Sequence, residues 1–275
     1  MDTCRIRFDR LAYHLLANRS GRLRWLLVFA LLIVLALRLG LGGEQDTSLR
    51  RVQQAGVLVV ALDASYPPFE TTDGRGNFGG FDVALGREIA RRLGVQAQFA
   101  NISFDNLYDA LAGGKADVVI SGLRYEAERT RDVIYTTPYF DAGQVFIVRS
   151  GDSAGKPADL AGRRVAVETA SETEVELQKL RAKLTGLQIR GYETREDGLT
   201  ALRRNEVDAL ATDRVSALSM IKNQTDVRLI LPPFAPDLLV AAGNIRDRTL
   251  MNEINRILRA LRDEGIIARL EAQSF

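Results

Sequence analysis

The stretches GGKADVVISG (residues 113–122) and RNEVDALATD (residues 204–213) share one layout. Each leaves the end of a helix, passes through a hydrophilic turn and an Asp, continues as an apolar strand and ends in a polar tip. Short apolar runs of this kind are typical of strands that are buried in a parallel sheet. The pair therefore predicts a fold built from two similar halves.

The first stretch completes a βαβαβ pattern. We expect a buried strand at 57–62, a helix at 81–93 ending at Gly94, and a short strand at 95–100. A helix from Ser103 to Ala112 and the strand at 116–121 follow. Right-handed crossovers between such strands make a parallel sheet.

The second stretch completes a matching pattern. Strands are predicted at 164–168, 187–192 and 207–212, and helices at 172–184, 195–204 and, in the amphipathic C-terminal part, 249–270. The segments 144–149 and 237–242 are predicted to cross between the halves. This predicts an α/β fold of two βαβ-rich lobes joined by a two-strand hinge, with residues 49–143 and 233–275 in lobe 1 and residues 144–232 in lobe 2.

The N-terminal 43 residues differ from this body. Residues 1–24 are rich in Arg and precede the apolar run WLLVFALLIVLAL (25–37). Extended to Gly43, this run approaches the roughly 20 residues of a membrane span. Basic residues before it predict a cytoplasmic N-terminus and an exported body. We expect residues 25–43 to be an uncleaved signal-anchor in the cytoplasmic membrane, with a cleaved signal peptide as the alternative.

Composition excludes several kinds of site. The net charge of +2 divides into +5 within residues 1–43 and −3 in the remainder, so the body gives no reason to expect nucleic acid. The only Cys and the only His, Cys4 and His14, both precede residue 25. The body is therefore predicted to hold no disulfide and no thiolate or His metal site. We also expect no cofactor.

Ligands of open parallel sheets bind beyond the carboxyl ends of the strands, and two such edges facing each other make a cleft. Arg129 follows one of these ends and can grip a carboxylate with two donors. Asp213, at the opposite edge, can accept from an ammonium. Phe104 and Tyr66 would close the walls. This arrangement suits a zwitterion.

The body resembles the periplasmic amino-acid-binding proteins of ABC importers, extracellular solute-binding family 3. The resemblance is carried, in this order, by GVLVVALDASYPPFE (56–70), GGFDVALGREIA (79–90), ALAGGKADVVISGL (110–123), DLAGRRVAV (159–167) and VDALATD (207–213), with shorter matches at 128–129 and 138–140. It implies a type II periplasmic-binding-protein fold. It also implies a non-enzymatic carrier that closes on an amino acid and presents it to a membrane permease.

The family's pattern implies a role for individual positions. Asp63 and Tyr66 correspond to contacts with the ligand side chain, and Phe104 corresponds to a stacking ring. Ser121 and Gly122 correspond to oxygens that receive the α-ammonium. Arg129 corresponds to the carboxylate-binding Arg and Asp213 to the ammonium-binding Asp.

Two positions depart from that pattern. Arg124 stands where a small hydroxyl residue is usual, and it would bind a second anionic group, fold out to solvent or fill part of the pocket. The second-lobe loop reads Ala170-Ser171-Glu172 instead of a Gly-Thr-Thr type of sequence. Ser171 still offers a hydroxyl and an N–H, whereas Glu172 brings a negative charge and would pair with Arg124 across a closed cleft.

Each assignment has a plainer alternative. Arg129 would form a surface ion pair with Glu126 or Asp132, and Asp213 would cap the helix that follows it. Asp63 would stabilise its own turn. Two other functions fit the same fold: a cyclohexadienyl-dehydratase-like enzyme using Glu168 or Glu172 as general acid, and a ligand sensor acting with a separate signalling partner.

Overall fold

The computed structural model describes residues 28–29, 46–73 and 75–275. The predicted basic segment 1–24 lies outside the described residues, as does the predicted span 25–43 apart from Val28 and Phe29. Among the residues that are described, no helix is both long and apolar enough to cross a membrane. All elements given below belong to the compact unit Thr47–Phe275.

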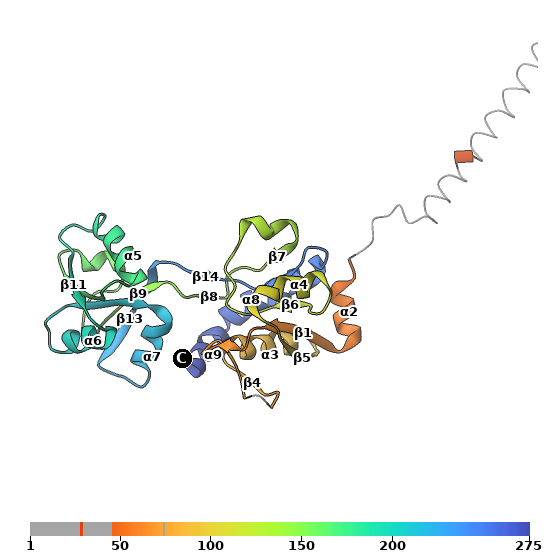
Figure 1. Cartoon of the computed structure of the whole chain (residues 1–275), viewed down its shortest axis with the longest axis horizontal. Coiled ribbons are helices and arrows are strands. Elements are labelled where there is room, and N and C mark those ends of the chain that lie inside the picture. The colour runs from red at the N-terminus through yellow and green to blue at the C-terminus, as the bar shows by residue number, and fades with distance from the viewer. Residues whose placement is uncertain (1–27, 30–45, 74) are drawn as a thin grey trace, which may run out of the picture. The chain divides into compact units, whose positions relative to one another are not determined.

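The first lobe is built on a five-stranded sheet (Figure 1). Its parallel strands are β1 (Val57–Leu62), β5 (Gln96–Asn101) and β6 (Val118–Val119). Strand β15 (Ala242–Asn244) returns from the C-terminal part of the chain and pairs antiparallel with β6 and with β7 (Val133–Tyr135). The strand order is β5-β1-β6-β15-β7.

Helices cover both faces of this sheet, which explains why β1 is apolar throughout. Leu58 and Val60 face a core shared with the helices on one side, whereas Ala61 faces a second core on the other side. The first core is completed by α2 (Ser48–Ala55), α3 (Phe81–Leu93), α8 (Arg248–Asp263) and α9 (Ile266–Ser274), and the second by α4 (Leu107–Ala112).

The second lobe repeats the plan. Strands β10 (Arg164–Glu168), β11 (Gln188–Tyr192) and β12 (Ala209–Asp213) are parallel, and β9 (Gln144–Arg149) and β13 (Val227–Ala235) extend the sheet antiparallel in the order β11-β10-β12-β9-β13. Helix α5 (Glu172–Arg181) packs on one face of the sheet; α6 (Arg195–Arg203) and α7 (Arg214–Ile221) pack on the other.

The chain crosses between the lobes on a short antiparallel pair, β8 (Phe140–Asp141) with β14 (Leu238–Leu239). The two-strand hinge is confirmed, but the prediction that 144–149 is a crossing strand is wrong. That segment is β9, buried within the second sheet, because its apolar side chains face both cores there. The exact lobe boundaries drawn from the sequence stay predictions.

Two first-lobe elements are shorter than predicted. The strand expected at 116–121 is reduced to β6, because its ends are tied to β1 partly through side chains: Asp117 Oδ2 accepts from Val59 N at 2.9 Å, and Ser121 Oγ accepts from Asp63 N at 3.0 Å. The helix expected from Ser103 begins as a 3-10 turn, Phe104–Asn106. Further 3-10 turns lie at Ala127–Arg131 and Pro157–Leu160.

A three-stranded sheet lies beside the loops at the carboxyl ends of the first lobe's parallel strands. It consists of β2 (Ser65–Tyr66), β3 (Glu70–Thr72) and β4 (Phe78–Gly79), all antiparallel. It brings Tyr66 and Glu70 to the end of the main sheet where β1 and β6 finish.

Candidate ligand-binding site

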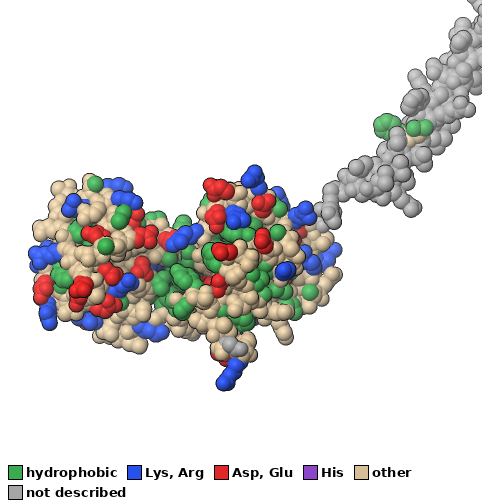
Figure 2. Space-filling model, in the orientation of Figure 1, with side chains coloured by type: hydrophobic (Ala, Val, Ile, Leu, Met, Phe, Trp, Pro, Cys, Tyr) green, Lys and Arg blue, Asp and Glu red, His purple; other side chains and the backbone are tan. Residues whose placement is uncertain are grey.

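A cavity of about 330 Å³ opens at the carboxyl ends of β1, β5 and β6 in the first lobe. Figure 2 shows the surface hollowed between the two lobes, with charged side chains on both sides of the hollow. Six of the ten predicted ligand-binding residues line this cavity: Asp63, Tyr66, Phe104, Ser121, Gly122 and Arg124. Ser65, Glu70, Ala142, Asp237 and Leu239 complete the lining. The structure therefore brings these six residues together at the strand ends, and their roles toward a ligand stay predictions.

Asp63 ties two of these loops. Its Oδ1 accepts from the hydroxyl of Ser65 at 2.7 Å, and its Oδ2 accepts from the backbone N–H of Phe104 at 2.8 Å. The turn-stabilising role is thus present, and the same side chain lines the cavity. Tyr66 and Phe104 remain 51% and 49% exposed. Large rings held open to solvent at a cavity are suited to contact a ligand.

Glu70, which lines the cavity, forms with Asp82 a buried pair of carboxyl groups that the sequence reasoning missed. Both side chains are fully buried. Glu70 Oε2 and Asp82 Oδ1 have no hydrogen-bond partner among the described residues. A proton on one carboxyl group supplies the donor that both oxygens lack.

Burial and the neighbouring Asp82 charge together raise the pKa of Glu70 to about 9, against the opposing hydrogen bond from Ser121. Burial also raises the pKa of Asp82, to about 6, against the opposing hydrogen bonds from Gly122 and Tyr139. When two neighbouring carboxyl groups have no cation close by, ionising both of them is unfavourable in free energy. Near neutral pH the pair therefore retains one proton.

This pair fixes the loop at the end of β6. The Ser121 hydroxyl donates to Glu70 Oε1 at 2.6 Å, and the Gly122 N–H donates to Asp82 Oδ2 at 2.8 Å. Gly122 has φ of +55°, and a Cβ there would lie 3.1 Å from the ring of Tyr66. Glycine is thus required by the backbone conformation and by the close ring.

Arg124 is held by a residue of the hinge. Its Nε and Nη2 donate to Oδ1 and Oδ2 of Asp237, each at 2.6 Å. The expected pairing of Arg124 with Glu172 is absent from this structure, because Asp237 beside β14 lies closer and takes both donors. The paired guanidinium borders the cavity without filling it.

Arg129 lies outside the lining of this cavity. Its guanidinium stacks over the Tyr108 ring at 4.4 Å, and its Nε lies 3.5 Å from Glu126 Oε2. The surface ion pair weighed as an alternative is therefore present, although it is long and the Arg129 side chain is 47% exposed. Its role as carboxylate clamp stays a prediction.

The remaining predicted residues lie at the carboxyl edge of the second sheet. Ser171 caps α5 by accepting from Glu174 N, and Glu172 is the exposed first residue of that helix. Asp213 caps α7, with Oδ1 accepting from Ser216 N at 2.8 Å. The capping role of Asp213 is thus confirmed, and its role toward a ligand stays a prediction.

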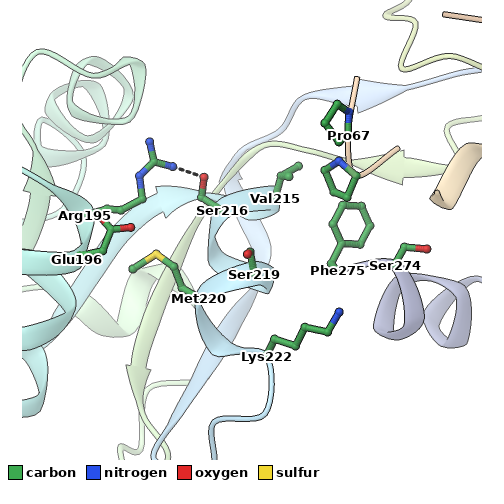
Figure 3. A pocket seen from close by; sticks show the side chains of 11 residues that line it. Pro67, Arg195, Glu196, Val215, Ser216, Ser219, Met220, Lys222, Ser274 and Phe275 are labelled. Atoms are coloured by element: carbon green, nitrogen blue, oxygen red, sulfur yellow. Dashed lines mark hydrogen bonds between the residues drawn. The ribbon is translucent and has the colours of Figure 1, made fainter. Parts of the chain in front are cut away.

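A guanidinium that the sequence reasoning overlooked lies on the same edge. Arg195, the first residue of α6, pairs through Nη1 with Asp213 Oδ2 at 3.1 Å and through Nη2 with Glu168 Oε2 at 3.1 Å. Its Nη1 also donates to Ser216 Oγ (Figure 3). The carboxylate expected to receive an ammonium therefore already has a cationic partner.

A second cavity, of about 580 Å³, lies between the lobes on the side of the C-terminal helix. Arg195, Val215 and Met220 line it from the second lobe, and Pro67 and Phe275 face them from the first (Figure 3).

Beside the same helix an ion pair joins the lobes. Arg214 Nη2 donates to Glu271 Oε2 of α9 at 2.6 Å, Arg214 Nη1 donates to the carbonyl of Asp141, and the guanidinium lies 4.7 Å from the Phe140 ring centre. Arg214 thus connects the second lobe to the hinge and to the first lobe.

The comparisons with known proteins agree with this architecture. The family model of bacterial extracellular solute-binding proteins, family 3, matches residues 58–275. The L-cystine-binding protein TcyJ of Escherichia coli (strain K12) is 27% identical over 230 residues, covering 82% of this chain and 85% of that protein. A probable histidine-binding protein of Neisseria gonorrhoeae is 26% identical, covering 92% and 95%. This chain belongs to the family 3 bacterial extracellular solute-binding proteins.

Solved structures show the type II periplasmic-binding-protein fold. An ancestral cationic amino acid solute-binding protein, AncCDT-1, is 29% identical with a TM-score of 0.55, and the alignment covers 83% of this chain and 99% of that one. A variant of an ancestral cyclohexadienyl dehydratase, AncCDT-3, has a TM-score of 0.71 at 24% identity, covering 82% and 95%. The latter likeness concerns the fold alone.

Proposed function

We propose that this protein captures an amino acid between its lobes and delivers it to the permease of an ABC importer. The observation that carries the proposal is the cavity at the strand ends, where Asp63, Tyr66, Phe104, Ser121 and Gly122 converge. The family membership supports it, as do relatives named for binding cystine, histidine and, in Escherichia coli (strain K12), arginine.

The hydrogen-bond directions around the cavity favour a ligand rich in donors. The Ser121 O–H donates to Glu70 and the Gly122 N–H donates to Asp82, so neither donor is left for a ligand. Arg124 is already occupied by Asp237. Asp63 forms no ion pair with any described residue, and its carboxylate lines the cavity. An amino acid with a basic side chain satisfies these acceptors best.

Isothermal titration of the body, residues 47–275, against the twenty amino acids and cystine tests this function. We expect micromolar or tighter binding of at least one basic amino acid and weaker binding of Glu and Asp. Tight binding of acidic amino acids alone would contradict the ligand class. A folded protein that binds none of the panel would contradict the function.

We further propose that the protein binds without converting its ligand. Incubation with prephenate and arogenate, followed by absorbance of phenylpyruvate and by chromatography of phenylalanine, tests this. Product formation above a buffer control that is lost in Glu168→Gln or Glu172→Gln would establish the dehydratase alternative instead.

From the sequence alone, we propose that residues 25–43 anchor the exported body in the cytoplasmic membrane near its permease. Full-length protein should stay with the membrane fraction after carbonate extraction, whereas a variant with three Arg substitutions in residues 26–36 should not. Release of a shortened, soluble body into the extracytoplasmic fraction would show a cleaved signal peptide.

A further inference from the structure

Arg195 occupies the place beside Asp213 that an incoming ammonium needs. Asp213 Oδ1 is taken by the N–H of Ser216, and Oδ2 is taken by Arg195 Nη1. A ligand ammonium approaching this carboxylate meets a guanidinium of the same sign, and like charges at contact distance weaken binding.

Glu168 offers the guanidinium a second partner. Arg195 Nη2 lies 3.1 Å from Glu168 Oε2, and Glu168 and Asp213 end the adjacent parallel strands β10 and β12. The three side chains are each about one-third exposed, so a ligand can reach them. Arg195 can lose its contact with Asp213 and remain paired with Glu168.

We propose that Arg195 is a specificity-determining residue that competes with the ligand's ammonium for Asp213, and that Glu168 retains its guanidinium when the ligand takes Asp213. The inference rests on the proposed function. The second lobe therefore prefers a ligand with an ammonium group less strongly than it would if Asp213 had no cationic partner. Glu168 determines the size of this reduction.

The test compares each of L-arginine, L-histidine and L-cystine with its deaminated counterpart: 5-guanidinopentanoate, imidazole-4-propionate and 3,3′-dithiodipropionate. The ratio of the counterpart's dissociation constant to that of the amino acid isolates the ammonium for arginine and histidine; for cystine it reports the loss of both ammonium groups. We expect R195M, and R195Q as a second variant, to increase this ratio in favour of the amino acid by at least about fivefold. The matched control R181M, on the exposed end of α5, should leave it unchanged.

A double-mutant cycle isolates the role of Glu168. E168Q should lower this ratio in the wild-type background. It should have no effect in the R195M background, because the Arg195 guanidinium that Glu168 retains is absent there. Circular dichroism checks that each variant is folded.

Two results would overturn the inference. If R195M and R195Q weaken the amino acid and its deaminated counterpart equally, Arg195 binds the ligand's carboxylate instead. If the ratio is unchanged in both, Arg195 does not affect Asp213. Wild-type protein that binds none of the three amino acids overturns the inference before any variant is compared, whereas only failure to bind all twenty amino acids and cystine refutes the proposed function.

Discussion

Arg214 of the second lobe and Glu271 of the first lobe form an ion pair of 2.6 Å whose side chains are only 12% and 15% exposed. This pair lies beside the hinge, where Arg214 also contacts Asp141 and Phe140. Burial raises the pKa of Glu271, and the nearby Arg214 charge lowers it in opposition. The pair therefore connects the two lobes at low exposure to solvent.

Glu271→Gln should lower the free energy of unfolding by about 3 kcal/mol, because it leaves the Arg214 charge buried without its partner. Urea denaturation monitored by fluorescence measures the change. Glu264→Gln, which breaks the exposed pair with Arg92, is the control and should cost no more than about 1 kcal/mol. Removing both members in Arg214→Met/Glu271→Met should cost less than Glu271→Gln alone. Equal losses in Glu271→Gln and Glu264→Gln would show that the Arg214–Glu271 ion pair contributes nothing special.

Gly122→Ala should weaken ligand binding as well as stability. The positive φ of residue 122 costs an alanine about 1 kcal/mol, and its Cβ would press on the Tyr66 ring, which lines the cavity. Gly114→Ala is a matched control, because Gly114 has φ of +65° with nothing within 4 Å of the added Cβ. Both variants should lose similar stability in denaturation, while titration calorimetry should show reduced affinity only for Gly122→Ala. Unchanged affinity in Gly122→Ala would remove Tyr66 from the ligand contacts.

The Glu70–Asp82 pair predicts a stability that declines with pH. The pKa of Glu70 rises from an ordinary value of 4.5 to about 9 on folding, so the folded protein binds the proton more tightly than the unfolded chain. Stability from this group is complete below pH 4.5 and is lost as the pH rises toward 9, by at most about 1.4 kcal/mol per pH unit.

Glu70→Gln supplies a permanent donor to Asp82 and should flatten this decline. Denaturant midpoints measured from about pH 5 to about pH 9 compare the two proteins, with Glu264→Gln as the control. Parallel pH profiles for wild type and Glu70→Gln would place the retained proton elsewhere.

Arg129→Ala should lower the affinity for the bound amino acid at least tenfold, since truncating a buried charge-assisted pair costs roughly 2–5 kcal/mol. The loss follows if the lobes close and bring the ligand's carboxylate to the guanidinium, which the long contact to Glu126 does not fully occupy. Arg131→Ala, in the same 3-10 turn, should bind normally. Calorimetric dissociation constants that coincide for the two variants would refute the clamp.

The repeat of an apolar strand and a polar tip was enough to predict the two halves and the loops that line the first-lobe cavity. It succeeded because buried strands need apolar side chains on both faces, as Leu58 and Ala61 show by facing different cores. It failed for 144–149, because an antiparallel central strand such as β9 has the same apolar character as a crossing segment.

The missed site residues depend on contacts that are distant in sequence. Asp82 resembled an ordinary helix-start acid, and its pairing with Glu70 depends on how β3 folds back beside α3. Arg195 resembled a solvated helix residue, and only the order of strands β10 and β12 places it between two carboxylates. An Asp in the first turn of a helix that is otherwise apolar on that face was the one available signal.

Asp213 and Arg214 are consecutive residues. Asp213 pairs with Arg195 at the carboxyl edge of the second sheet, whereas Arg214 pairs with Glu271 on α9 of the first lobe. If closure of the lobes carries Asp213 onto a captured solute, as proposed, it also moves the adjacent Arg214 guanidinium, and solute binding is then linked to the Arg214–Glu271 ion pair through one peptide unit. In that case the measured affinity would be the free energy of the solute contacts less the free energy needed to weaken this ion pair. A solute too small to contact both lobes would leave the Arg214–Glu271 ion pair intact, and the lobes would then stay apart around it.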